Sequence, residues 1–292
     1  MGNCAGGSYG TEDIFYVPEA GFSIPVRTVR KMGWKPDYPD HRDRQLVLVK
    51  EKDQDLPSSK DLRPKEHFEI YDQGDLGSCT ANAICGAFHF DQVQEGLVEF
   101  VPSRLFVYYN ERRMEIPPGE QDYDSGAYLR DGIKTVCQIG VCDEKTWPYN
   151  TDEFTKKPTS ASYTEATKNK ALEYASVAQD LEQMKLCIAS GIPFVFGFTV
   201  YSSFFSRETA LNGTMKMPTS SDTVAGGHAI MAVGYDDSKK VFIIRNSWGS
   251  SWGDKGYFYM PYDYIAQPAL ASDFWAIKTV SGKKFVTKKR HG

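Results

Sequence analysis

The sequence has no hydrophobic run long enough to cross a bilayer. Its longest nearly unbroken apolar stretch, 192–200, is about half of the roughly 20 residues that a membrane-spanning helix needs. No hydrophobic stretch follows Met1 either, so the pattern of a secretory signal peptide is missing. We therefore expect neither a transmembrane segment nor a secreted precursor.

Neither sign of charge is in excess. The 292 residues include 34 Lys and Arg against 38 Asp and Glu, which gives a formal net charge of −4. Such a balance offers no strongly basic surface to nucleic acid or to an anionic membrane, so we expect no nucleic-acid partner. The oligomeric state is not readable from the sequence, and we treat the chain as a monomer by default. Hydrophobic residues make up 41%, enough for one large core or two modest cores that share a cleft.

Cysteine is scarce and irregularly spaced. Without a signal peptide, nothing argues for an oxidising compartment in which disulfides form. We expect mostly free thiols, and we favour the cytoplasm or another reducing compartment. Cys137 and Cys142 have no companion ligands for a zinc site, so we expect no metal and no cofactor. The six cysteines are Cys4, Cys79, Cys85, Cys137, Cys142 and Cys187.

The first residues superficially resemble a lipidation signal. Gly2 follows the initiator Met, as in myristoylated proteins, and Cys4 is a candidate for palmitate. The myristoylation signal needs Ser or Thr at position six, where this chain has Gly6. That departure argues against lipidation.

The first 56 residues differ in composition from those that follow. Prolines within 33–40 favour extended chain over helix, and the charged run 50–55 contains no apolar residue. We place a domain boundary at its end. The predicted organisation is an N-terminal extension over 1–56, a main domain over 57–281 and a basic C-terminal tail over 282–292.

Local patterns predict a helical first half and a sheet-forming second half. This segregation is typical of an α+β protein of two subdomains, with a cleft between them as the natural place for a site. Caps and apolar periodicity favour helices that open at Ser78, cover 104–114 after Ser103, cover 125–138, and follow an Asp180–Gln183 capping box. Short β-branched or aromatic runs favour strands at 194–200, 228–234, 241–245, 257–260 and 274–280.

One helix start carries the first candidate for chemistry. Gly74, Gly77 and Ser78 give a sharp turn, so that Cys79 lies at a helix N-terminus. Backbone N–H groups and the positive end of the helix dipole stabilise a thiolate there. The other interpretation is a buried small hydrophobe, and only a base elsewhere in the chain can decide between the two.

His228 has the best context for that base. It follows Gly226-Gly227 and opens a predicted strand, while Asn246 ends the neighbouring predicted strand. The Asn246 amide oxygen is therefore positioned to hold the imidazole in one tautomer. The other histidines lie in polar sequence or too far along the Cys79 helix; they are His41, His67, His89 and His291.

Taken together, these residues resemble the papain-like cysteine peptidases, the family that contains the cathepsins. The pattern consists of Gln73 six positions before Cys79, Gly-Gly-His-Ala at 226–229, and Asn-Ser-Trp-Gly-x-x-Trp-Gly at 246–253. His228 follows Cys79 by about 150 residues, within the expected range. The resemblance covers 56–280 and implies a papain-like fold, with a helical left subdomain, a β-barrel-like right subdomain and the active-site cleft between them.

The resemblance also implies an endopeptidase that hydrolyses peptide or protein substrates through a Cys79–His228–Asn246 triad and a thioester acyl-enzyme. The ion pair with histidine and the helix end would lower the thiol pKa to roughly 3.5–7.5. The Gln73 amide and the Cys79 N–H would hold the oxyanion. The residues implied to contact substrate are Ser125, Gly126, Gly227 and Ser272, with Trp248 and Trp252 supporting the site.

Three positions depart from the family pattern. Leu76 stands where the family usually has a disulfide cysteine, Tyr123 replaces its partner, and Thr80 replaces the tryptophan after the nucleophile. Loss of both bridge halves agrees with a reducing milieu and resembles bacterial or large-virus members. If the source is viral, the virion is an alternative location. Thr80 would remove a bulky wall near the leaving-group side.

Several alternatives stay open. The resemblance makes 1–56 an inhibitory prosegment of a zymogen, yet this stretch lacks the long charged helix usual there, so a permanent extension or docking arm is the alternative. The same fold could be a catalytically silent binding module, although Gln73, Cys79, His228 and Asn246 are all present. An acyl-transferase with the same triad differs only in the acceptor.

Overall fold

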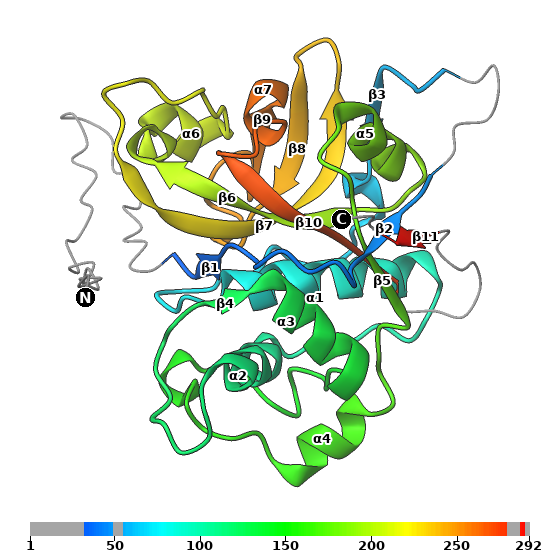
Figure 1. Cartoon of the computed structure of the whole chain (residues 1–292), viewed down its shortest axis with the longest axis vertical. Coiled ribbons are helices and arrows are strands. Elements are labelled where there is room, and N and C mark those ends of the chain that lie inside the picture. Colours follow the sequence, from blue (N-terminus) through cyan, green and yellow to red (C-terminus); the bar gives the residue numbers. More distant parts are fainter. Residues whose placement is uncertain (1–31, 49–54, 279–286, 290–292) are drawn as a thin grey trace.

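The computed structural model describes residues 32–48, 55–278 and 287–289. Helices from the first half of the chain form one layer and most strands form a second, as Figure 1 shows. The expected α+β class is therefore found. None of the helices within the described residues is long and apolar enough to cross a membrane. The α-helices are α1 (Cys79–Gln94), α2 (Arg104–Glu115), α3 (Leu129–Lys134), α4 (Ser160–Ala166), α5 (Leu181–Ala189), α6 (Arg207–Asn212) and α7 (Tyr262–Ile265).

The second layer is one large sheet with the strand order β11-β2-β5-β10-β6-β7-β8-β9, and β3 (Ser59–Asp61) also pairs with β7. The pairing does not join β11 to β9, so the expected barrel-like subdomain is an open sheet in the described part of the chain. The strands along this path are β11 (Thr287–Lys289), β2 (Arg44–Leu46), β5 (Glu173–Ser176), β10 (Ala271–Lys278), β6 (Phe194–Tyr201), β7 (Val224–Asp236), β8 (Val241–Arg245) and β9 (Tyr257–Pro261).

Helix α1 lies between the two layers and is buried on almost every side. Its sequence is apolar or small all round, because the sheet covers one face and α2 and α3 cover the other. The predicted start at Ser78 is confirmed. Two predicted caps are confirmed as well: the Ser103 side chain accepts from the Phe106 N–H, and the Asp180 side chain accepts from the Gln183 N–H.

The helix expected over 125–138 begins later than predicted. Residues Ala127–Tyr128 form strand β4, and only then does α3 begin, continuing into a π-helical turn over Thr135–Ile139. The end at Gly140, which has a positive φ of 95°, agrees with the prediction. Pairing with a distant strand overrides the local helical pattern at the start.

That distant strand comes from the N-terminal extension. We call residues 32–48 the strap. Strand β1 (Trp34–Lys35) pairs in parallel with β4, and β2 pairs in parallel with β5 and antiparallel with β11. In Figure 1 the blue strap runs along the junction of the two layers. Because β11 belongs to the expected tail, part of that tail lies in the sheet.

Candidate active site

Cys79 is the first residue of α1 and has no exposed surface. The backbone N–H groups of Ala229 and Gly33 face its sulfur. Ala229 directly follows His228 on β7, so the helix start and the strand bring the predicted nucleophile and the predicted base to one place. His228 lies in the middle of β7 and not at its start as expected, because the strand already begins at Val224.

The His228 ring is held by Asn246. Its Nε2 lies 2.8 Å from the Asn246 Oδ1, which also accepts the Ser247 backbone N–H at 2.8 Å. Because this amide oxygen only accepts, Nε2 must carry the proton. Nδ1 is then the ring nitrogen that can exchange a proton with a thiol.

Aromatic rings pack around the His228–Asn246 pair. Trp248 stacks on His228 with 5.0 Å between ring centroids. Trp252 packs edge-on against Trp248 at 5.0 Å, and Phe198 packs edge-on against the His228 ring at 5.8 Å. Water is thereby kept from the His228–Asn246 bond, which strengthens it.

Gln73 is fully buried, and both ends of its amide are held. Its Oε1 accepts from the Ser247 hydroxyl at 2.7 Å, and its Nε2 donates one hydrogen to the Leu76 carbonyl at 3.0 Å. The second Nε2 hydrogen is left for an oxyanion. Sequence reasoning missed Ser247, although its place beside Asn246 in the same motif was a usable signal.

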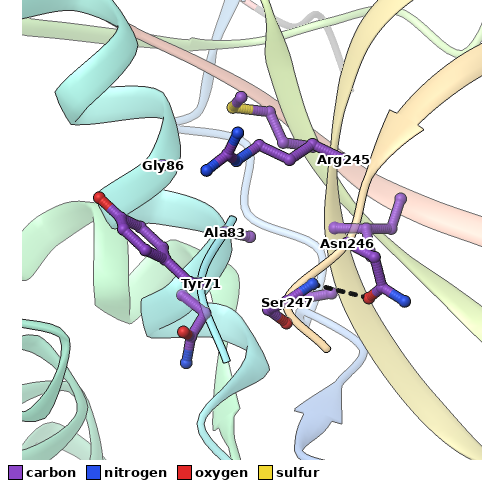
Figure 2. Close-up of a pocket in the computed structure, with 10 residues that line it drawn as sticks. Tyr71, Ala83, Gly86, Arg245, Asn246 and Ser247 are labelled. Carbon is purple, nitrogen blue, oxygen red and sulfur yellow. Dashed lines mark hydrogen bonds between the residues drawn. The ribbon is translucent and has the colours of Figure 1, made fainter. Parts of the chain in front are cut away.

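Figure 2 shows a small cavity between α1 and the end of β8. Its volume is about 10 Å³, space for one water molecule at most. Asn246 lies in its wall, and the described residues give the Asn246 Nδ2 no hydrogen-bond partner. The cavity is too small to hold a substrate.

The strap lies against Cys79, because the Gly33 backbone N–H faces its sulfur. Gly33 is so close to the nucleophile loop that an added Cβ would lie 1.7 Å from the Gly77 carbonyl oxygen. The Gly33 carbonyl accepts from the Ala127 N–H at 2.7 Å. The strap therefore lies against Cys79 and along β4 at once.

Covering the sulfur changes its acidity. Burial raises the pKa of Cys79 to about 12, although the N–H groups of Ala229 and Gly33 lower it. The lowered pKa expected from the family resemblance is therefore wrong for this closed form, because the thiolate has no water around it. The prediction concerned an open cleft.

The four expected substrate contacts lie around the strap. A Cβ added at Gly126 would lie 2.1 Å from the Gly33 carbonyl oxygen. A Cβ added at Gly227 would lie 2.6 Å from the Trp34 carbonyl oxygen. Ser125 directly precedes Gly126, but the backbone that pairs with the strap begins at Ala127. Ser272 on β10 pairs with Gly197 on β6. The hydrogen bond with the Trp34 indole is made by the next residue, Asp273.

The two positions that replace the family disulfide do not meet. Leu76 is buried, whereas the Tyr123 side chain is 61% exposed. Their neighbours are joined instead, since both oxygens of Asp124 accept the Gly77 N–H at 3.2 Å. Tyr108 also donates to Asp124. Sequence reasoning missed this carboxylate.

Thr80 is not a cleft wall. It is fully buried, and its hydroxyl donates to the Glu111 carboxyl at 2.6 Å. Burial raises the pKa of Glu111 well above its usual value, while the hydrogen bond from Thr80 lowers it. The described cysteines form no disulfide, as predicted; Cys4, Gly2 and the lipidation question lie outside the described residues.

Comparisons with known proteins agree with this geometry. Residues 56–275 match the family model described as papain family cysteine protease. The uncharacterized peptidase C1-like protein L477 of Acanthamoeba polyphaga mimivirus is 41% identical over 276 residues, which cover 86% of this chain and 88% of that protein. Cathepsin B-like CP2 of Giardia intestinalis is 27% identical over 70% of this chain and 69% of its own length.

A solved structure is similar over nearly the whole chain. Xylellain, a cysteine protease from Xylella fastidiosa, superposes with a TM-score of 0.81 at 44% identity and covers 89% of this chain and 100% of its own. Procathepsin L 3 of Tenebrio molitor has a TM-score of 0.61 at 17% identity, over 82% of this chain and 76% of its own; this likeness concerns the fold alone. The viral and bacterial relatives agree with the disulfide-poor branch that the sequence indicated.

Proposed function

The chain belongs to the papain family of cysteine proteases and is a cysteine peptidase, and on that premise we propose that it is an endopeptidase made as a zymogen. Cys79 is the nucleophile, His228 the base and Asn246 the residue that orients the base. The observation that carries this assignment is the N–H of Ala229 at the Cys79 sulfur, next to an imidazole whose Nε2 lies 2.8 Å from Asn246.

In the proposed mechanism, Cys79 gives its proton to the His228 Nδ1 and its sulfur attacks a peptide carbonyl carbon. The oxyanion accepts the Cys79 backbone N–H and the second Nε2 hydrogen of Gln73, and losing one such donor typically costs about 3 kcal/mol. His228 then protonates the leaving amine, which leaves a thioester. Water, deprotonated by His228, hydrolyses the thioester and releases the acid.

The strap is the proposed inhibitor. It offers Cys79 an amide N–H from Gly33, while the Gly33 carbonyl accepts from the Ala127 N–H and so faces strand β4. The covered thiol is also a poor nucleophile, since burial raises its pKa to about 12. Opening the cleft gives a substrate access to Cys79 and lets water reach its sulfur.

The proposed boundaries are an inhibitory extension over 1–56, a peptidase domain over 57–281 and a tail over 282–292. Removal of the extension must also release β2 from β5 and β11, because both strands pair with it. N-terminal sequencing of fully active protein decides the matter. An intact Met1 there would make the strap a permanent, displaceable arm.

The test of the whole proposal is intact mass after reaction with a peptidyl epoxide at mildly acidic pH. Full-length protein and a Trp34→Ala variant, in which the strap loses its main anchor, are compared with Cys79→Ala. We expect one adduct, faster in Trp34→Ala and absent in Cys79→Ala. An adduct that persists without Cys79, or none in either form, contradicts the assignment. Adding a primary amine to a peptide ester separates acyl transfer, which yields an amide, from hydrolysis.

A further inference from the structure

The start of α1 is held by contacts from other elements. In the described part of the chain, the side chain of the N-cap residue Ser78 accepts no backbone N–H of the first turn. Its hydroxyl lies 2.5 Å from the Tyr149 hydroxyl and accepts from the Asn82 amide at 3.0 Å. The first turn, which carries Cys79, therefore lacks the usual cap and depends on partners elsewhere.

Glu111 on α2 is one of these partners. Thr80 directly follows Cys79, and its hydroxyl donates to the Glu111 Oε1 at 2.6 Å. Both Thr80 and Glu111 are fully buried, and α2 packs against α1 on the side away from the sheet (Figure 1). The bond ties the residue after the proposed nucleophile to a second helix, across 31 positions of sequence.

The other carboxyl oxygen of Glu111 is buried without a partner. None of the residues that the structure describes gives its Oε2 a hydrogen bond. A Cβ added at Gly132 on α3 would lie 2.3 Å from this oxygen, and Arg112, the next residue on α2, pairs with Asp122 instead. A carboxylate buried in this way costs far more free energy than a neutral acid.

Neighbouring groups act on Glu111 from three helices. Burial raises the pKa of Glu111 well above its usual value, and the Thr80 hydrogen bond lowers it. Glu115 on α2 and Asp131 on α3 raise it further, while Arg112 lowers it. The net effect favours the neutral acid, in agreement with the unpartnered oxygen.

We propose that Glu111 is a positioning residue for the nucleophile: as an uncharged acid it accepts from Thr80, fixes the first turn of α1 and so holds Cys79 in place. This inference rests on the proposed function. Because Glu111 is fully buried, it acts through Thr80 and touches no substrate. An uncharged acid can do so without opposing the thiolate, since a negative charge on Glu111 would raise the pKa of Cys79.

The experiment follows labelling of Cys79 by a peptidyl epoxide in the full chain with Trp34→Ala, the parent. Adding Thr80→Val should lower the rate at saturating epoxide by about ten- to hundred-fold, the scale of a misplaced reacting group. The half-saturating concentration should change little, and Thr80→Ser, which keeps the hydroxyl, should restore the rate.

Thr135→Val is the matched control. Thr135 is also fully buried, and its hydroxyl donates to the Asp131 carbonyl at 3.0 Å, away from the first turn of α1. This change should lower the free energy of unfolding and leave the labelling rate unchanged. Equal losses of rate at both threonines would mean a general effect of stability and would contradict the positioning role.

Glu111→Gln tests the charge. Glutamine keeps an acceptor for Thr80 and is always neutral, so it should restore the labelling rate that Glu111→Leu loses. The acid limb of the pH profile, which reports ionisation of Cys79 beside His228, should lie at the same pH in Glu111→Gln as in the parent. A limb displaced to lower pH would mean that the native Glu111 is charged, against the proposal.

The parent separates this inference from the proposed function. If Cys79 is labelled in the parent and equally fast in Thr80→Val, the positioning role is wrong and the proposed function stands. If the parent gives no Cys79-dependent adduct, both are wrong. If Thr80→Val does not fold, the pH profile of Glu111→Gln decides in its place.

Discussion

Gly77 donates its backbone N–H to the Asp124 carboxylate, 3.2 Å from each oxygen. Gly77 lies two residues before Cys79, the proposed nucleophile, and Asp124 lies three residues before the strand that pairs with the strap. The carboxylate thus joins the loop before Cys79 to strand β4. A reducing compartment leaves this polar link intact.

We expect Asp124→Ala to lower the free energy of unfolding by about 1–3 kcal/mol, because the Gly77 and Tyr108 donors lose their acceptor. It should also raise KM in protein freed from the strap, since β4 is no longer fixed. Chemical denaturation and peptide kinetics measure both. The neighbouring exposed Tyr123→Ala is the matched control and should change neither. Equal effects at both positions would contradict the role of Asp124.

Ser247→Ala should lower kcat about ten-fold with little change in KM, because the Gln73 amide loses the hydroxyl that fixes its Oε1. Gln73→Ala should cost more, about 10²–10³-fold, the scale of an oxyanion donor. The two changes act on one group, so the double variant should match Gln73→Ala. Multiplicative losses would mean that Ser247 acts elsewhere.

Gly33→Ala should open the cleft. The new Cβ would lie 1.7 Å from the Gly77 carbonyl oxygen, so the strap must move away from Cys79. We expect faster epoxide labelling of Cys79 and higher basal turnover. Gly96→Ala is a control glycine with a positive φ and no atom within 4 Å of its added Cβ, and it should leave labelling unchanged. Unaltered labelling in Gly33→Ala would contradict the inhibitory role of the strap.

The strap should be held most firmly at acid pH. Burial and then the Asp273 carboxylate raise the pKa of Asp37 to about 7, while Arg130 and the Trp275 hydrogen bond lower it. An exposed aspartate titrates near 3.9, so the closed form binds this proton more tightly. The stability that this proton gives to the closed form is complete below about pH 4 and is lost as the pH rises to about 7.

Hydrogen exchange of the strap amides, normalised to the intrinsic rate at each pH, measures this effect. Protection should fall between about pH 4 and 7 in the wild type. In Asp37→Asn the side chain at position 37 does not ionise, so protection should fall less over the same range. Asp273 and Glu115 contact the strap in both proteins and burial raises their pKa values too, so they account for the fall that remains. Protection that rises with pH would contradict this account.

The sequence alone predicted the parts of the site that depend on local chemistry. Ser78 precedes α1, and Asn246 follows a strand whose bounds, Val241–Arg245, are those predicted. Turn residues and apolar alternation decide such features within a few residues. The assignment of Cys79, His228, Asn246 and Gln73 as a reacting set stays a prediction until the labelling experiment is done.

What the sequence could not predict depends on pairs far apart in the chain. Asp273 and Trp34 meet across 239 positions, and nothing near either residue indicates the other. The same holds for β4, where a helical pattern gives way to pairing with β1. The acidity of Cys79 was predicted for an open cleft and failed because a remote segment covers the sulfur.

Strand β2 makes the proposed inhibitor a tethered competitor. Because β2 is paired within the sheet on both sides, Trp34 cannot diffuse away when it leaves its contacts with Gly197 and Gly227, and a short tether corresponds to a local concentration on the order of millimolar. A free peptide at micromolar concentration loses that competition unless it binds far more tightly. The rate of hydrolysis then depends more on whether the strap is still tethered than on the substrate concentration. A single cut that frees the strap would therefore switch the activity on.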